Sequence, residues 1–110
     1  MKYSTFSLEG RMVSLVDTSE SAELKSNQYE GDYSNFYLKN GEFIPKVEFP
    51  TPSGNFMDCG NRVPGDSLFI NGIGQMVEGE IIIEFSESGE YEIAIDFLEY
   101  LQKTFTVIIP

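Results

Sequence analysis

The chain has 110 residues, of which 41% are hydrophobic and 14% aromatic, the length and composition of one folded domain with an ordinary core. Its net charge of −11, from 18 acids and 7 bases, argues against direct binding to nucleic acid or to an anionic membrane, because phosphate binding needs a clustered basic surface. No stretch approaches the roughly 18 apolar residues of a membrane span. Cys59 is the single cysteine, so no internal disulfide forms, and we expect a cytoplasmic protein.

Short β-prone runs open the chain. Residues 3–8 and 11–16 each predict a strand on either side of Glu9-Gly10. The polar segment 17–28 predicts at most one helical turn, capped by Thr18 or Ser19.

A hairpin is expected near the middle of the chain. Residues 33–39 and 42–49 flank Asn40-Gly41, and Asn-Gly between two β-prone runs is a strong hairpin signal, because both central residues need a positive φ. Pro45 lacks the N–H that a ladder needs, which predicts an edge strand or a bulge at that position.

The second half predicts a long loop followed by four strands. Residues 51–65 are rich in Pro, Gly and polar turn formers, which predicts the loop. Asn71-Gly72 predicts a turn, and Gly79 predicts a bulge. The predicted strands span residues 66–70, 76–85, 90–98 and 103–109. With about eight strands in all, we expect an all-β chain, a single antiparallel β-sandwich of about 7–8 strands that covers residues 1–110 as one domain.

An acidic face is predicted on two of these strands. No basic residue occurs between Arg62 and Lys103, whereas this stretch holds nine acids. Its alternating segments 80–85 and 90–97 predict a hairpin with apolar side chains inside. One shared outer face would then carry Glu80, Ile82, Glu84, Glu90, Glu92 and Asp96. Such a face is expected either to dock on a basic partner or simply to be solvated.

The run from Glu87 to Tyr91, Glu-Ser-Gly-Glu-Tyr, resembles the entry into strand F of immunoglobulin-like domains, where the Tyr forms a corner. The resemblance covers only residues 80–110 and implies that 81–85 is strand E and 105–109 is strand G. Ile93 stands where the second disulfide cysteine would be, and the chain has no Trp. The resemblance therefore implies a disulfide-free branch and a binding or scaffold role.

Catalytic chemistry is poorly supported, and no enzyme activity is expected. The chain has no His to act as general base or metal ligand, and Asp58 next to Cys59 disfavours a reactive thiolate. Calcium ligands could come from the turn-rich segments that hold Glu30, Asp32, Asp58 and Asn61, but no spaced Asp-x-Asp loop supports such a site. No cofactor and no metal are therefore expected.

Two further segments have the composition of binding loops. Tyr29 and Tyr33 lie in a stretch rich in Tyr, Ser, Asn and Gly, which recurs in protein-binding loops. Phe56 and Met57 sit at the centre of the predicted loop 51–65 and are candidate anchors for a partner. In both segments the alternative is that these side chains belong to the core.

The sequence favours a non-enzymatic protein-binding domain, an acidic inhibitor-type protein of phage or bacterial kind. Its expected partner is a basic protein, such as a nucleic-acid-binding one, with carboxylates in place of phosphates. The alternative is an Ig-like structural or adhesion module of a phage particle or cell-surface protein. A third class, less favoured, is an enzyme that uses carboxylates alone. We expect a monomer or a homodimer.

Overall fold

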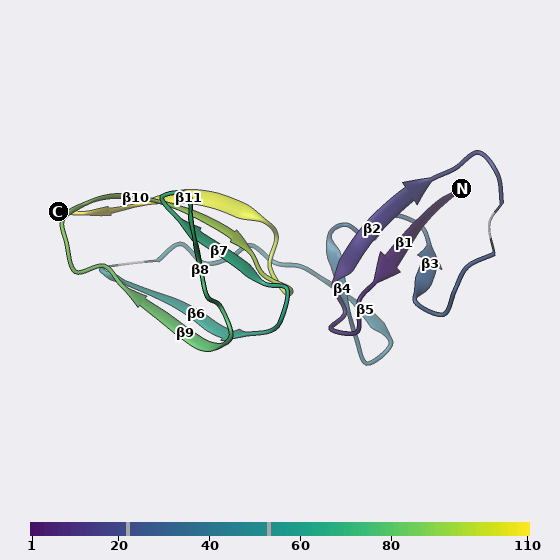
Figure 1. The fold of residues 1–110 in the computed structure, drawn as a ribbon, viewed down its shortest axis with the longest axis horizontal. Helices are drawn as coiled ribbons and strands as arrows, with labels where there is room; N and C mark the ends of the chain where they lie inside the picture. Colours follow the sequence, from purple (N-terminus) through teal and green to yellow (C-terminus); the bar gives the residue numbers. More distant parts are fainter. Residues whose placement is uncertain (22, 53) are drawn as a thin grey trace. The chain divides into compact units, whose positions relative to one another are not determined.

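The structure, a computed structural model, describes residues 1–21, 23–52 and 54–110. These residues form eleven strands and no helix, and every pairing between strands is antiparallel (Figure 1). The prediction of an all-β chain is therefore confirmed, with more and shorter strands than expected. The chain divides into two compact units, Met1–Lys46 and Val47–Pro110, each described below by itself. The expectation of one domain over residues 1–110 stays a prediction.

The Met1–Lys46 unit holds a three-stranded and a two-stranded sheet. The three-stranded sheet has the order β2-β1-β3, and the two-stranded sheet pairs β4 with β5. The bounds are β1 Lys2–Phe6, β2 Met12–Asp17, β3 Gln28–Glu30, β4 Phe36–Lys39 and β5 Glu42–Pro45. The helical turn considered for residues 17–28 does not form in its described part, and Ala22 lies outside the described residues.

The β4–β5 hairpin confirms the Asn-Gly prediction. Asn40 and Gly41 have φ angles of 52° and 76°, the left-handed backbone that a tight two-residue hairpin turn requires. Pro45 pairs with Phe36 at the end of this two-stranded sheet, where its missing N–H leaves no interior ladder bond unmade.

Gly10 lies in close backbone contact with β4. Its φ is +91°, and a Cβ built there would lie 1.9 Å from the carbonyl oxygen of Leu38. The amide of Leu38 in turn donates to the carbonyl oxygen of Gly10 over 2.9 Å. Only glycine fits this approach, which ties the β1–β2 turn to β4.

The core of this unit is aromatic. The ring of Phe6, which is buried, lies 5.8 Å from Tyr29 and 5.6 Å from Phe43, measured between ring centroids. Tyr33 stacks on Phe43 at 4.0 Å with an interplanar angle of 7°. Such pairs add to the free energy gained by burying their surface. The rings of Tyr29 and Tyr33 are therefore part of this aromatic core.

The Val47–Pro110 unit holds a four-stranded sheet of order β11-β10-β7-β8 and a two-stranded sheet of β6 and β9. The bounds are β6 Phe56–Arg62, β7 Ser67–Ile70, β8 Ile73–Gln75, β9 Gly79–Glu84, β10 Gly89–Asp96 and β11 Lys103–Ile109. Asn71 and Gly72 both have positive φ between β7 and β8, as the predicted turn requires.

The two sheets of this unit lie as layers on one hydrophobic core (Figure 1). Buried side chains come from both layers and from the flanking segments: Phe49, Met57, Cys59, Leu68, Phe85, Ile93, Ile95, Phe97 and Val107. Ile93 and Phe97 are fully buried, at 0% exposure. The inward alternation predicted for 80–85 and 90–97 is confirmed by these positions.

The predicted hairpin of 80–85 with 90–97 is wrong. β9 pairs with β6, whereas β10 pairs with β11 and β7, so the turn between them carries the chain from one sheet to the other. Inward alternation has the same period in a hairpin and in two strands that face each other across a core, so the pattern could not separate the two arrangements. The six residues predicted on one outer face therefore lie on two.

The predicted long loop 51–65 is also wrong over half its length. β6 occupies Phe56–Arg62 with alternating exposed and buried positions, and Ser53 lies outside the described residues. The bulge expected at Gly79 occurs instead on the partner strand, where the register shifts between Asp58 and Gly60. Gly79, with φ of 77°, begins β9.

The buried Arg62 closes one end of this unit. Its guanidinium pairs with Asp66 at 3.4 Å and with Glu99, and lies 4.3 Å above the ring of Phe97. The carboxylate of Asp66 also accepts hydrogen bonds from the amides of Val63 and Leu98. Two of the nine acids of the base-free stretch are thus partners of the arginine that precedes it.

Across the residues that the structure describes, no helix has the length and apolar character needed to cross a membrane.

Candidate protein-binding face

The outer face of the β6–β9 sheet brings together two residues that the sequence placed apart. Phe56 pairs with Glu84 and Asp58 with Ile82, so these four side chains share one face of the antiparallel ladder. Phe56 and Ile82 are diagonal neighbours on it. Glu80, two residues before Ile82, extends the same face. We call these five residues the β6–β9 outer face.

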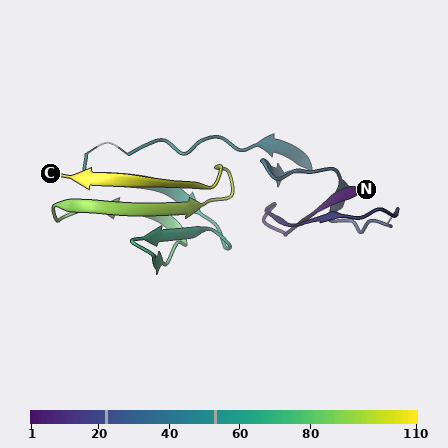
Figure 2. The same cartoon turned by 90° about the horizontal axis from the view of Figure 1, so that it is seen from above.

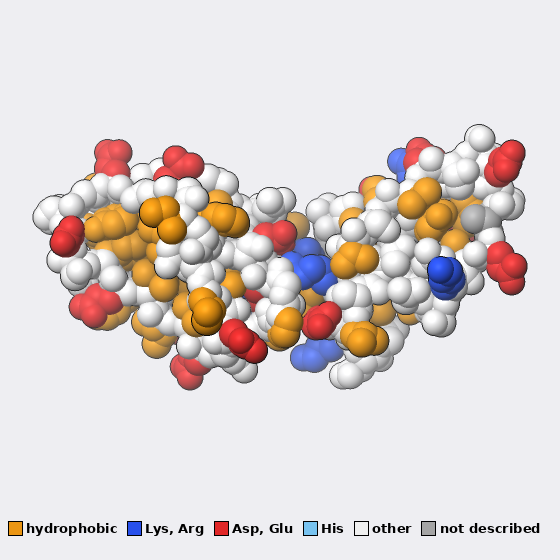
Figure 3. All heavy atoms as spheres, viewed as in Figure 1, with side chains coloured by type: hydrophobic (Ala, Val, Ile, Leu, Met, Phe, Trp, Pro, Cys, Tyr) orange, Lys and Arg blue, Asp and Glu red, His pale blue; other side chains and the backbone are white. Residues whose placement is uncertain are grey.

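Two large apolar side chains of this face are open to solvent. Phe56 is 53% and Ile82 58% exposed, and the three carboxylates around them are exposed as well. Figure 3 shows acidic side chains around apolar ones on the visible side of the Val47–Pro110 unit. Neighbouring apolar side chains with polar groups around them are also the composition of many protein–protein interfaces.

The other three predicted acids lie on the opposite layer. Glu90 and Glu92 are exposed on β10, and Asp96 is half-buried near the end of that strand. Their neighbours on the outer face of the four-stranded sheet include Phe69 opposite Ala94 and Ile108 opposite Glu90. This second face, the β10 outer face, carries the same kind of charge, but its two exposed apolar side chains are not neighbours, because β10 separates Phe69 on β7 from Ile108 on β11.

Of the four aromatic and apolar residues predicted in binding loops, three have side chains that are buried or half-buried. Met57 is 1% exposed and faces the core, so it is not available to a partner and that prediction is corrected. Alternation along β6 turns Met57 inward and its neighbour Phe56 outward. Tyr29 and Tyr33 are half-buried in the aromatic core of the Met1–Lys46 unit.

The thiol of Cys59 is buried beside Met57 on the inner side of β6. Burial raises the pKa of Cys59 to about 11, an effect that the nearby Arg62 charge partly opposes and that Asp58 reinforces. At neutral pH the thiol is therefore protonated and a poor nucleophile. Its side chain serves packing.

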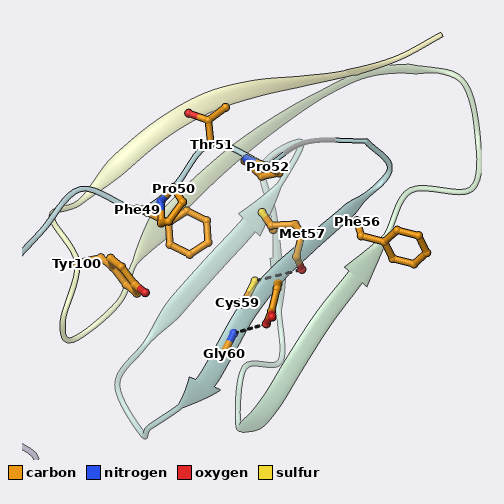
Figure 4. Close-up of a pocket in the computed structure, with 10 residues that line it drawn as sticks. Phe49, Pro50, Thr51, Pro52, Phe56, Met57, Cys59, Gly60 and Tyr100 are labelled. Atoms are coloured by element: carbon orange, nitrogen blue, oxygen red, sulfur yellow. Dashed lines mark hydrogen bonds between the residues drawn. The ribbon is translucent and has the colours of Figure 1, made fainter.

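A groove runs along the edge of β6 that faces away from β9. Its volume is about 440 Å³. One wall is the segment Phe49–Pro52 with Tyr100, and the other is β6 from Phe56 to Gly60. In Figure 4 the side chains of Met57 and Cys59 point toward Phe49 and Pro52, while Phe56 points away from them.

Backbone and side-chain contacts hold the wall of the groove that is formed by Phe49–Pro52. Val47 forms a parallel bridge with Tyr100, and the Lys103 ammonium donates to the carbonyl oxygen of Phe49 over 3.1 Å. Lys103 also pairs with Glu48 at 3.0 Å. The segment that begins at Val47 therefore runs along the β11 side of the unit (Figure 2).

The sequence offered part of this site. Glu80, Ile82, Glu84 and Phe56 were candidates, but they were assigned to two separate features. Asp58 and the groove were missed, although the alternation of Met57 and Cys59 with polar neighbours was a strand signal. Proline and glycine on both sides of that run favoured a loop prediction. Within the described parts of the chain, no three acid or cysteine side chains lie close enough together to hold a metal ion.

Comparison of the chain with protein-family models, with curated proteins and with solved structures gave no match.

Proposed function

We propose that this chain is a non-enzymatic protein-binding domain whose β6–β9 outer face docks on a basic surface of another protein. The observation that carries the proposal is the exposure of Phe56 and Ile82 side by side among Asp58, Glu80 and Glu84. Aromatic side chains supply much of the binding energy of interfaces, and a carboxylate rim selects a cationic partner. Nucleic-acid-binding proteins are the natural class of such partners, because their phosphate sites accept carboxylates.

We further propose that the Val47–Pro110 unit is an immunoglobulin-like sandwich. Two observations support this. β10 lies between β11 and β7 while β9 pairs with β6, which is the strand order expected if these are strands F, G, C, E and B. The hydroxyl of Tyr91 donates to the carbonyl oxygen of Glu87 over 2.8 Å, as a tyrosine corner does.

If the Val47–Pro110 unit is an immunoglobulin-like sandwich, a second candidate function is that of a structural or adhesion module of a particle or cell surface. Such a module would use its strand edges and loops as spacers or contacts rather than an acidic face. Its binding would then be insensitive to charge changes on the β6–β9 outer face.

Charge reversal separates these functions. A partner captured with the immobilised chain is identified, and its affinity is measured at low and at high salt for two double variants. Glu80→Lys with Glu84→Lys reverses charge on the β6–β9 outer face. The matched control, Glu90→Lys with Glu92→Lys, makes the same change on the opposite layer. We expect the first pair to abolish binding and the second to change it only slightly.

Truncation of the apolar centre gives an independent test. Phe56→Ala is expected to weaken binding by about thirtyfold, the effect of losing an interface hot spot of ~2 kcal/mol. Ile108→Ser is the control, because Ile108 is 67% exposed on the other sheet. Affinity that is independent of salt and of both the Phe56 and the Glu80/Glu84 changes would refute the proposed function.

A further inference from the structure

The edge of β6 that borders the groove has no strand paired to it. Among the described residues, β6 pairs only with β9, in a sheet of two strands. The amide of Phe85 donates to the carbonyl oxygen of Asn55 over 2.8 Å, which makes these two a hydrogen-bonded pair. In an antiparallel ladder, bonded and non-bonded pairs alternate. The N–H and C=O groups of Phe56 and Asp58 therefore point away from β9.

Both of these residues line the groove. Their backbone groups thus face an open channel rather than a neighbouring strand. Unpaired strand edges are templates for another extended segment, which gains backbone hydrogen bonds by joining the sheet.

Two prolines explain why the chain's own segment Phe49–Pro52 does not pair with this edge of β6. Pro50 and Pro52 are two residues apart, so in an extended segment both present their backbone to the same edge, and neither has an N–H to donate. The carbonyl oxygen of Phe49 is bound by Lys103, on the side of β11. The segment can wall the groove but cannot complete a ladder with β6.

We infer that the groove receives an extended segment of the basic partner, which adds to β6 as a strand. The inference rests on the proposed protein-binding function and states how the partner docks. Side chains of an added strand alternate between the two faces of the sheet. An apolar residue would point toward Met57 and Cys59, and the next residue would lie on the outer face beside Phe56 and Asp58.

Charge complementarity selects the occupant. The outer face carries Phe56 and Asp58 on β6 itself and Glu84 and Glu80 on β9, and the chain carries −11 overall, so Lys or Arg is favoured at the outward positions. A second copy of this chain would bring like charge to the same edge. The expected occupant is therefore a strand that alternates basic and apolar residues.

The probe is a library of short random peptides displayed on phage and selected on the full chain. We expect enrichment of peptides that alternate Lys or Arg with an apolar residue. On binding of a selected peptide, the amides of Phe56 and Asp58 should become protected from hydrogen exchange, because they gain partners. The amide of Met57, which faces β9, should change little.

Three variants, two at Asp58 and one at Thr51, test whether a partner strand pairs with the edge of β6. Asp58→Pro and Asp58→Ala both remove the carboxylate, and only the first removes the outward N–H. Asp58→Pro should bind the peptide about fivefold more weakly than Asp58→Ala, the effect of one lost backbone hydrogen bond. Thr51→Trp, which changes an exposed residue of the groove wall, should abolish binding while urea unfolding remains close to that of the parent chain.

The outcomes separate the inference from the proposed function. If the Glu80/Glu84 reversal blocks the captured partner but Asp58→Pro and Thr51→Trp do not, strand addition is wrong and the face proposal stands. Selected peptides without alternation, or unchanged exchange at Phe56 and Asp58, also overturn it. Self-association that Thr51→Trp abolishes would assign the edge to a second copy instead.

Discussion

The hydroxyl of Tyr91 donates a hydrogen bond to the backbone carbonyl oxygen of Glu87, four residues earlier, over 2.8 Å. The ring of Tyr91 also packs on Phe85, with 4.8 Å between ring centroids. One side chain thereby joins the end of β9 to the start of β10 across the turn that links the two layers.

Tyr91→Phe removes only the hydroxyl of this corner. We expect the free energy of unfolding to fall by about 1 kcal/mol, the net contribution of one hydrogen bond. Urea denaturation followed by tyrosine fluorescence measures the change. Tyr100→Phe is the control, because it makes the same atomic change at another tyrosine of this unit, whose ring packs on Phe49 and Phe97. Equal stability of the two variants would count against the corner.

Arg62→Ala removes the cation that lies between Asp66, Glu99 and the Phe97 ring. The side chains of Arg62 and Asp66 are 3% and 1% exposed, so the substitution leaves a buried carboxylate without its charge partner. We expect a loss of about 3–5 kcal/mol in the free energy of unfolding.

Glu99→Gln is the comparison for the arginine, because the Glu99 side chain is 36% exposed and Gln keeps an oxygen that can accept from the guanidinium. Its cost should stay near or below about 1 kcal/mol. A cost for Arg62→Ala no larger than this would mean that the buried pair contributes little.

Gly10→Ala tests the close approach of the first turn to β4. The added methyl group would overlap the carbonyl oxygen of Leu38 and would also strain a positive φ. Gly41→Ala is the matched control, since Gly41 has positive φ but open space around its Cβ position. The control should lose about 1–2 kcal/mol, and Gly10→Ala should lose clearly more. Thermal unfolding of both variants against the parent chain measures the difference.

Because the thiol of Cys59 is buried, we expect the free energy of unfolding to fall at alkaline pH. Its pKa is raised by burial to about 11 in the folded chain, from 9.0 when free. A raised pKa means that the folded state holds the proton more tightly. The stabilisation is therefore complete below pH 9 and is lost as the pH rises toward 11, by about 2–3 kcal/mol for a shift of this size.

Urea unfolding of the parent chain and of Cys59→Ala across this pH range isolates the thiol, because other titrating groups are common to both. The stability difference between the two chains should narrow as the pH rises. A constant difference would contradict the burial of the thiol.

Local signals in the sequence were reliable where backbone chemistry decides the structure. Asn40-Gly41 and Asn71-Gly72 marked two turns because few other residues accept a positive φ. The inward sets on β9 and β10 followed from the alternation of apolar residues. Which strands are neighbours could not be predicted in the same way. An alternation with a period of two shows which face of a strand is inside, but not which strand lies beside it.

The candidate site could not be predicted in full, because it depends on which strands are neighbours. Phe56 and Ile82 were each singled out, yet their diagonal placement on one face depends on pairing between segments more than twenty residues apart. The strand β6 itself was hidden because Gly54 and Gly60, both with positive φ, resemble loop glycines in the sequence. Arg62 likewise gave no signal of burial, since its partners Asp66 and Glu99 converge only in the fold.

The paired prolines of the groove wall have a consequence for solubility. An edge left open toward solvent can recruit identical chains into ordered aggregates, and at neutral pH the carboxylates beside it keep copies of this acidic chain apart. Acidification removes that repulsion while the backbone groups of Phe56 and Asp58 stay unpaired. The spacing of Pro50 and Pro52, which prevents their own segment from pairing with this edge, thus makes colloidal stability depend on ionised acids.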